Sequence, residues 1–197
     1  IQLLYSKSSI NQLIVGGVFF LCVWLNVDEI FTLLPEKFQG GKWVVFYIGI
    51  SQLFNITSGI NGTIIVNSKY YKYDLYTNVL LVFITIATNY ILIPIYGIDG
   101  AAMATALSVF LFNLIRLFLI KIKMGMQPFS LNTLKTIILL FGLFLAMNEL
   151  PNTANAFLDI LWKSILALAL YIPTVLYLNL SEDISAIIRE LKDKFIN

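Results

Sequence analysis

The sequence predicts an all-α integral membrane protein built as a bundle of about six transmembrane helices, followed by a C-terminal amphipathic helix. Of its 197 residues, 59% are hydrophobic and 12% are charged, and the mean hydropathy is +0.85. A soluble domain has roughly half apolar and a quarter charged residues. The apolar residues also stand in long blocks instead of alternating with polar ones. Because a helix satisfies its own backbone hydrogen bonds in lipid, such blocks predict spanning helices.

The blocks long enough to cross a bilayer as helices of about 20 residues cover residues 10–31, 42–66, 75–95, 98–120, 131–147 and 157–178. Pro94 and Gly97 stand between the third block and the fourth. Proline and glycine end helices and permit tight reversals, so these two helices are predicted to form an antiparallel hairpin. Residues 1–180 are therefore expected to form the membrane bundle.

Residues 181–197 have a different pattern, in which apolar side chains recur at helical spacing beneath a charged face. These apolar residues are Ile184, Ile187, Ile188, Leu191 and Phe195. The pattern predicts an amphipathic helix that lies on the cytoplasmic surface of the membrane. A helix packed on a cytoplasmic partner protein has the same pattern, and both interpretations stay open.

Basic residues mark alternate loops between the blocks. They are Lys7, Lys69, Lys72, Arg116, Lys121, Lys123, Lys135, Arg189, Lys192 and Lys194. The intervening loops are expected to hold most of the acidic residues, Glu29 and Asp159 among them, with Lys163 nearby. Since positive charge is retained on the cytoplasmic side, both ends of the chain are expected in the cytoplasm. The chain begins at Ile1 instead of Met, so we expect a fragment of a longer protein.

Residues that carry enzyme chemistry are scarce. The chain has no histidine and a single cysteine, Cys22, within an apolar block, which removes the usual nucleophile–base pairs and histidine metal sites. No phosphate-binding loop, CxxC pair or paired catalytic carboxylates occur in the sequence. We therefore expect no enzyme activity, no cofactor and no metal. The basic and aromatic run 69–73 resembles surfaces that bind nucleic acids, but at a membrane boundary Tyr and Lys are better explained as interfacial anchors, so no nucleic-acid partner is expected.

Polar side chains inside the blocks are mainly amides and hydroxyls. In the second block Gln52, Asn55, Gly59 and Gly62 fall at i, i+3, i+7 and i+10, which places them on one stripe if the helix is continuous. Such groups are costly in lipid unless they face protein or water. The candidates for lining a hydrated cavity are Gln52, Asn55, Asn61, Asn78, Asn89, Asn113 and Arg116. Packing of helices through small residues and interhelical hydrogen bonds is the alternative explanation of the same residues.

Arg116 is the single arginine inside an apolar block. It is expected to extend along the helix to the cytoplasmic headgroups, as long basic side chains do near helix ends. The alternative is an inward arginine that pairs with a lipid-linked phosphate. Asp74 and Asp99 lie at helix ends and are expected to be solvated, so no buried acidic residue identifies an ion site.

The hairpin and its surroundings carry a family resemblance. The matching residues are Asn89, the run 92–94 (Leu-Ile-Pro), the run 96–102 (Tyr-Gly-Ile-Asp-Gly-Ala-Ala), Ala104, Thr105, Ser108 and the run 127–129 (Gln-Pro-Phe). This pattern resembles the C-terminal half of polysaccharide and O-antigen flippases, which belong to the multidrug/oligosaccharidyl-lipid/polysaccharide exporter superfamily. The likeness covers roughly residues 8–178.

The resemblance implies a transporter of two helical lobes around a central cavity, of which this chain would be the C-terminal lobe. Its partners would be the lipid bilayer, the N-terminal six-helix lobe of the same polypeptide and an undecaprenyl-pyrophosphate-linked oligosaccharide. The cargo would be flipped across the bacterial cytoplasmic membrane by alternating access. No substrate-binding residue of the family maps securely onto this sequence.

Two other functions stay open. A small-molecule or cation antiporter of the same superfamily would be expected to have buried acidic residues in the bundle, and the sequence suggests none. A non-transporting membrane scaffold for glycan assembly would use the C-terminal amphipathic segment to bind its partner.

Overall fold

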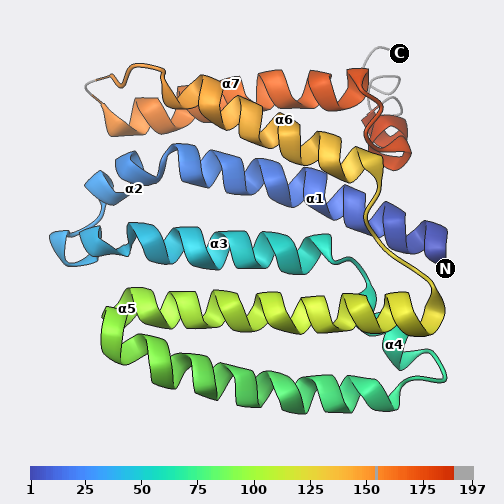
Figure 1. Ribbon diagram of the computed structural model, residues 1–197. Helices are drawn as coiled ribbons and strands as arrows, with labels where there is room; N and C mark the ends of the chain where they lie inside the picture. Colours follow the sequence, from blue (N-terminus) through green and yellow to red (C-terminus); the bar gives the residue numbers. More distant parts are fainter. Residues whose placement is uncertain (154, 189–197) are drawn as a thin grey trace.

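The computed structural model describes residues 1–153 and 155–188, and every regular element within them is helical. The elements are α1 (Gln2–Leu25), α2 (Val27–Leu33), the 3-10 helix η1 (Glu36–Gly41), α3 (Lys42–Thr57), α4 (Asn61–Val66), α5 (Lys72–Met124), α6 (Leu131–Asn148) and α7 (Ala156–Tyr177). The long helices run side by side as an elongated bundle (Figure 1). The predicted all-α class is confirmed.

Four of the described helices, α1, α5, α6 and α7, are long and apolar enough to cross a membrane. These helices indicate a multi-pass membrane protein. Helix α3 has 16 residues, which corresponds to about 24 Å and falls short of a hydrocarbon core of about 30 Å. The predicted count of six spanning helices is therefore not confirmed.

Helix α5 is a hairpin of two helical arms. Its backbone leaves helical geometry at Gly97, where φ is 59° and ψ is −127°, and the chain reverses there so that the arms lie side by side (Figure 1). A side chain at Gly100 would place its Cβ 2.2 Å from the carbonyl oxygen of Leu92. Farther along the arms, the hydroxyl oxygens of Thr88 and Ser108 are 2.9 Å apart. The predicted hairpin is confirmed, and the close approach of the arms at Gly100 requires glycine there.

Replacing Gly97 with alanine is expected to lower the free energy of unfolding by about 1–3 kcal/mol, because the backbone conformation there is one that residues with a Cβ rarely adopt. A Cβ at Gly97 meets no atom within 4 Å, so the cost comes from the backbone alone. Gly142, inside α6, is the matched control because its Cβ position is also empty. Gly142→Ala should stabilise the protein by about 0.5–1 kcal/mol. Unfolding in mixed micelles followed by circular dichroism measures both, and equal effects would contradict the prediction.

The second apolar block does not form one continuous helix. Helix α3 ends at Thr57, and α4 begins at Asn61. Between them Gly59 has a φ of +68°, and its Cα packs against the ring of Tyr5, where a Cβ would lie 3.3 Å from two ring carbons. The predicted stripe from Gln52 to Gly62 along a single helix is therefore wrong, because the left-handed glycine turns the chain before the stripe is complete.

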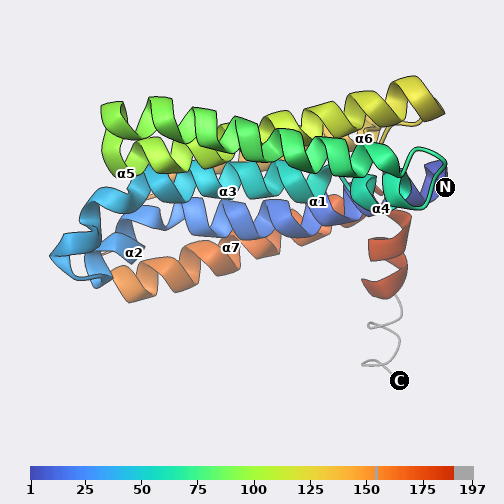
Figure 2. The ribbon, with the colours of Figure 1, turned by 90° about the horizontal axis from the view of Figure 1, so that it is seen from below.

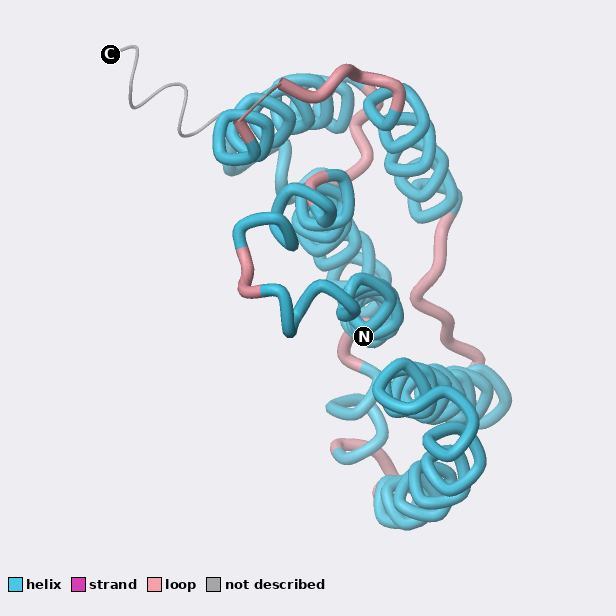
Figure 3. The backbone as a smooth tube through the Cα atoms, turned by 90° about the vertical axis from the view of Figure 1, so that its left-hand side faces the viewer, coloured by secondary structure: helices cyan, strands magenta, loops and turns pink. Residues whose placement is uncertain are grey.

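Helix α1 is the central element of the upper part of the bundle. It packs against α3 on one side and against α6 and α7 on the other, while α5 packs against the far side of α3. Figure 3, viewed along the helices, shows this order. A Cβ at Gly16 would lie 2.2 Å from Ile56 of α3, and a Cβ at Gly17 would lie 2.4 Å from Leu140 of α6. The two glycines therefore let both neighbours approach α1 closely.

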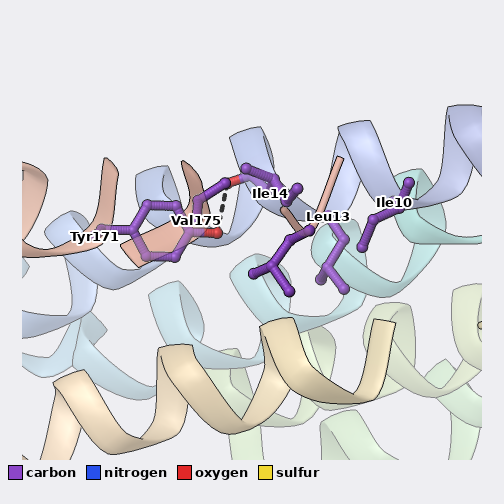
Figure 4. Close-up of a cluster of buried hydrophobic side chains, with 6 residues drawn as sticks. Ile10, Leu13, Ile14, Tyr171 and Val175 are labelled. Atoms are coloured by element: carbon purple, nitrogen blue, oxygen red, sulfur yellow. Dashed lines mark hydrogen bonds between the residues drawn. The ribbon is translucent and has the colours of Figure 1, made fainter. Parts of the chain in front are cut away.

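The apolar core between α1 and α7 contains Ile10, Leu13, Ile14, Tyr171 and Val175 (Figure 4). The hydroxyl of Tyr171 donates a hydrogen bond of 3.0 Å to the backbone carbonyl of Ile14. A buried tyrosine hydroxyl usually has a hydrogen-bond partner, and here the neighbouring helix supplies it. The contact fixes the position of α7 along α1.

The segments that carry most of the basic residues gather at one end of the bundle. The N-terminus, α4 and the connection from α5 to α6 lie at this end, and α2 and the reversal of α5 lie at the other (Figure 1). Gln2 donates to the backbone carbonyl of Gln127 at 2.8 Å, and Lys7 donates to Asp183 at 3.1 Å. Arg189, Lys192 and Lys194 lie outside the described residues. The side of the membrane on which this end lies stays a prediction.

The segment after α7 turns away from the bundle axis, and residues 182–188 are helical (Figure 2). Asp183 accepts hydrogen bonds from Asn11 at 2.8 Å and from Lys7 at 3.1 Å. These bonds, that from Asn11 first, hold the pKa of Asp183 below its ordinary value. The docked segment is therefore stabilised at neutral pH, and this contribution is lost as the pH falls through the lowered pKa. Leu191 and Phe195, part of the predicted amphipathic face, lie outside the described residues.

Candidate functional site

Four side chains join in a chain of hydrogen bonds between α3, α4 and the second arm of α5. Asn61 donates to the Asn113 side-chain oxygen at 3.0 Å, and Asn113 donates to the Asn55 side-chain oxygen at 2.9 Å. Asn55 in turn donates to Gln52 at 3.3 Å. We call Asn61, Asn113, Asn55 and Gln52 the amide chain. It unites three segments that are separate in sequence.

The amide chain leads from the interior of the bundle to its surface. Asn113 is 1% exposed and Asn61 is 6% exposed, whereas Asn55 and Gln52 are exposed. The second amide hydrogen of Asn113 is satisfied by the carbonyl of Val109 at 3.0 Å. Interhelical hydrogen bonds of this kind contribute about 0.6–2 kcal/mol each in a bilayer. The buried amides therefore fix the packing, and the exposed ones offer donors and acceptors to a ligand.

Arg116 lies one turn beyond Asn113 and forms a second polar cluster with Asp74, Thr77 and Asn78, here called the Arg116 cluster. Its Nη2 donates to Asp74 and, at 3.4 Å, to Asn78, and its Nε donates to Thr77 at 3.4 Å. The arginine is buried. The expected extension toward the headgroups is therefore wrong, because a carboxylate on the neighbouring arm holds the guanidinium inside.

The Arg116 cluster also corrects the expectation that Asp74 is solvated. Asp74 is in the first turn of α5, partly buried, and it additionally accepts a hydrogen bond from Asn78 at 3.0 Å. The Arg116 guanidinium also lies 4.1 Å from the ring centroid of Phe112. It lies next to Gly62, where a Cβ would be 2.9 Å from Nη1. Nε and Nη2 are thus engaged and one face of the guanidinium lies on an aromatic ring, which leaves less of the group for a lipid-linked phosphate.

Asn89 stands apart from both groups. Its side chain donates to the backbone carbonyl of Thr85 at 2.7 Å within the first arm of α5. It borders a shallow cleft of about 510 Å³ together with Tyr90 and Pro94. The structure thus joins Gln52, Asn55, Asn61 and Asn113, and separately joins Asn78 and Arg116. That all of these residues line one hydrated cavity stays a prediction.

Two overlapping clefts lie over α1, between α3 and α6. Their volumes are about 470 Å³ and 330 Å³, and both are bordered by Leu13, Ile50, Leu53 and Ile137. Thr57, Ser130 and Thr133 also border the first. The surfaces that line both clefts are apolar, so these clefts suit hydrocarbon better than a hydrated sugar.

Sequence reasoning missed a buried ion pair at the end opposite the basic segments. Lys163 of α7 donates to Glu29 of α2 at 2.7 Å and to the Asn152 side-chain oxygen at 2.6 Å. The side chains of Lys163 and Glu29 are only 6% and 8% exposed. The expectation that no acidic residue is buried is therefore wrong for Glu29, because its partner Lys163 makes burial favourable.

Asp159, one turn before Lys163, is a second buried acid. Both carboxylate oxygens accept the backbone N–H of Thr153 at 2.9 Å, and Oδ1 also accepts the indole N–H of Trp162 at 2.8 Å. Asp159 and Lys163 are four residues apart and so share one face of α7. That spacing, beside an apolar block, was the signal in the sequence that these charges belong to the helix and face its neighbours.

Comparisons of the chain with protein-family models, with curated proteins and with solved structures found no match. Among the described residues, no group of three or more acidic, cysteine or histidine side chains could hold a metal ion. The amide chain is the candidate site because it leads from a buried side chain to exposed donors and acceptors, whereas Arg116, Lys163, Glu29 and Asp159 are buried.

Proposed function

We propose that this chain is the C-terminal half of a transporter that flips lipid-linked oligosaccharide across the bacterial cytoplasmic membrane by alternating access. The observation that carries the proposal is the amide chain, which presents Asn55 and Gln52 at the bundle surface and anchors them on the buried Asn113. The resemblance of the hairpin around Gly97 to polysaccharide and O-antigen flippases supplies the cargo class.

The chemistry of the amide chain suits a glycan headgroup. Each sugar hydroxyl that enters hydrocarbon without a partner costs several kcal/mol. Amide groups both donate and accept hydrogen bonds, so Gln52 and Asn55 can replace water for hydroxyls without adding charge. The second lobe of the same polypeptide would close the other side of the path, and the lipid tail would stay in the bilayer.

The proposed orientation places both ends of this chain in the cytoplasm. It is supported by the gathering of basic segments at one end of the bundle, where Lys69, Lys72, Lys121 and Lys123 are all exposed. Positive charge of this kind is retained on the cytoplasmic side of a membrane.

Substitution of the exposed amides tests the proposal. In cells that lack the native gene, the full-length transporter with Gln52→Leu and Asn55→Leu is expected to flip lipid-linked repeat units roughly 5- to 30-fold more slowly, because about 1–2 kcal/mol of hydrogen bonding to the cargo is lost. The measurement is the accumulation of repeat units on the cytoplasmic leaflet. Asn148→Leu, which replaces an exposed amide at the end of α6, is the control. Equal flipping rates for the native protein, the double variant and the Asn148→Leu control would contradict the proposed role of Gln52 and Asn55.

A cation-coupled antiporter of the same superfamily is the second candidate, and the buried acids Glu29 and Asp159 favour it. Ionisable groups within a membrane bundle often mark ion pathways. Glu29→Gln should then abolish efflux of a cationic dye driven by a proton or sodium gradient. If the protein is instead a flippase without such coupling, the Glu29→Gln variant should still flip the lipid-linked cargo. Neither the native protein nor the variant should then export the dye.

A further inference from the structure

A group of lysines surrounds the open end of the α5 hairpin. Lys69 and Lys72 lie where the first arm begins, and Lys121 and Lys123 lie where the second arm ends. All are exposed, and within the described part of the chain none of them forms an ion pair. The nearby carboxylate of Asp74 is already bound by Arg116. The positive charge at this end therefore lacks a counterion from the described residues.

Tyrosine rings connect the lysines of the two arms. The Lys69 ammonium lies 5.2 Å from the centroid of the Tyr70 ring, and the Lys123 ammonium lies 6.0 Å from that of Tyr73. The rings of Tyr70 and Tyr73 are 6.1 Å apart and meet edge to face. Lys69, Tyr70, Tyr73 and Lys123 thus form one continuous row, here called the Lys–Tyr row. Cation–π contacts hold both ammonium groups beside the aromatic surface.

The opposite end of the bundle has a different charge arrangement. There Lys42 pairs with Asp28 and Lys163 pairs with Glu29. Lys37 lies 5.0 Å from the centroid of the Phe38 ring, but that ring carries no hydroxyl. A set of exposed lysines beside tyrosine rings, without ion-pair partners among the described residues, is thus a feature of the hairpin end.

We propose that the Lys–Tyr row is a binding site for the phosphate headgroups of anionic phospholipids. Ammonium groups attract phosphate at the membrane surface, and each lysine near an anionic leaflet contributes about 1 kcal/mol. Tyrosine rings lie at the depth of the headgroups, with the ring toward the acyl chains and the hydroxyl toward the phosphate. Because the row joins the two arms, a bound headgroup bridges the open end of the hairpin. The site is independent of the cargo that the protein transports.

Native mass spectrometry of the detergent-solubilised chain tests the site by titration with phosphatidylglycerol or phosphatidylcholine. The double variant Lys69→Gln with Lys123→Gln is expected to bind phosphatidylglycerol about 25-fold more weakly, at about fivefold per lysine. Binding of phosphatidylcholine should be unchanged. Lys37→Gln, which removes an exposed lysine beside an aromatic ring at the other end, should leave both affinities unchanged. The double variant Lys69→Arg with Lys123→Arg should preserve the preference for phosphatidylglycerol.

Several results would overturn the proposal. Equal affinities of the native chain for the two lipids, or an equal loss with Lys37→Gln, would remove the site. Displacement of phosphatidylglycerol by micromolar inorganic diphosphate would assign the row to a free phosphate ligand, and displacement by a single-stranded RNA oligonucleotide would assign it to nucleic acid. Circular dichroism of each variant must show native helicity. The replaced side chains are exposed, so the fold should be retained.

Discussion

Replacing Lys163 with methionine is expected to lower the free energy of unfolding by about 3–5 kcal/mol, the cost of leaving one member of a buried ion pair without its partner. Lys163 contacts the Glu29 carboxylate at 2.7 Å and the Asn152 amide oxygen at 2.6 Å. Its removal therefore leaves the Glu29 carboxylate buried without its counterion, and the amide oxygen of the exposed Asn152 loses its donor. The end of the bundle opposite the basic segments should become the least stable part.

Unfolding by sodium dodecyl sulfate in mixed micelles, followed by the fluorescence of the adjacent Trp162, measures this change. The double variant Glu29→Gln with Lys163→Met should recover most of the lost stability, since no uncompensated charge remains. Lys42→Met is the matched control because its partner Asp28 is 69% exposed, and an exposed pair contributes at most about 1 kcal/mol. A loss for Lys163→Met no larger than that of Lys42→Met would contradict the buried pair.

Replacing Arg116 with methionine is expected to cost about 3 kcal/mol, because Asp74 would lose its counterion in a partly buried position. Thr77 and Asn78 would lose hydrogen bonds at the same time. Asp74→Asn alone should also lower the free energy of unfolding. Combined with Arg116→Met, it should restore much of the lost stability, because no unpaired charge remains. Hydrogen exchange in the first turns of α5 would locate the loosened region.

Lys121→Met provides the comparison for Arg116→Met, since Lys121 is exposed on the same arm and forms no ion pair in the described residues. It should change the stability by less than about 0.5 kcal/mol. If the two variants unfold alike, the guanidinium is not held by Asp74 and the interpretation as a headgroup contact returns.

The reversal of α5 could be predicted from sequence because its cause is local. Pro94 and Gly97 disfavour helix over a few residues, whatever the rest of the chain does. The break at Gly59 is equally local, and Ser58, Asn61 and Gly62 stand beside it, but these small and polar residues also fit one stripe of a continuous helix, so the break was not predicted. The stripe along 52–62 failed for this reason.

The ion pairs could not be predicted because their partners are distant in sequence. Glu29 and Lys163 are 134 residues apart, and Asp74 and Arg116 are 42 residues apart. Viewed alone, a charge near the end of an apolar block suggests solvation, and only the partner helix makes burial favourable. The amide chain was closer to prediction, because amides inside apolar blocks require partners even when those partners cannot be named.

The adjacent glycines of α1 have a mechanical consequence. Helix α3 packs closely at Gly16, and α6 packs closely at Gly17, one residue later. Two groups of helices therefore contact α1 at neighbouring residues that have no side chain. If α6 and α7 move relative to α3 and α5, we expect them to rotate about the axis of α1. Translation along α1 is resisted by the hydrogen bond from Tyr171 to the backbone carbonyl of Ile14.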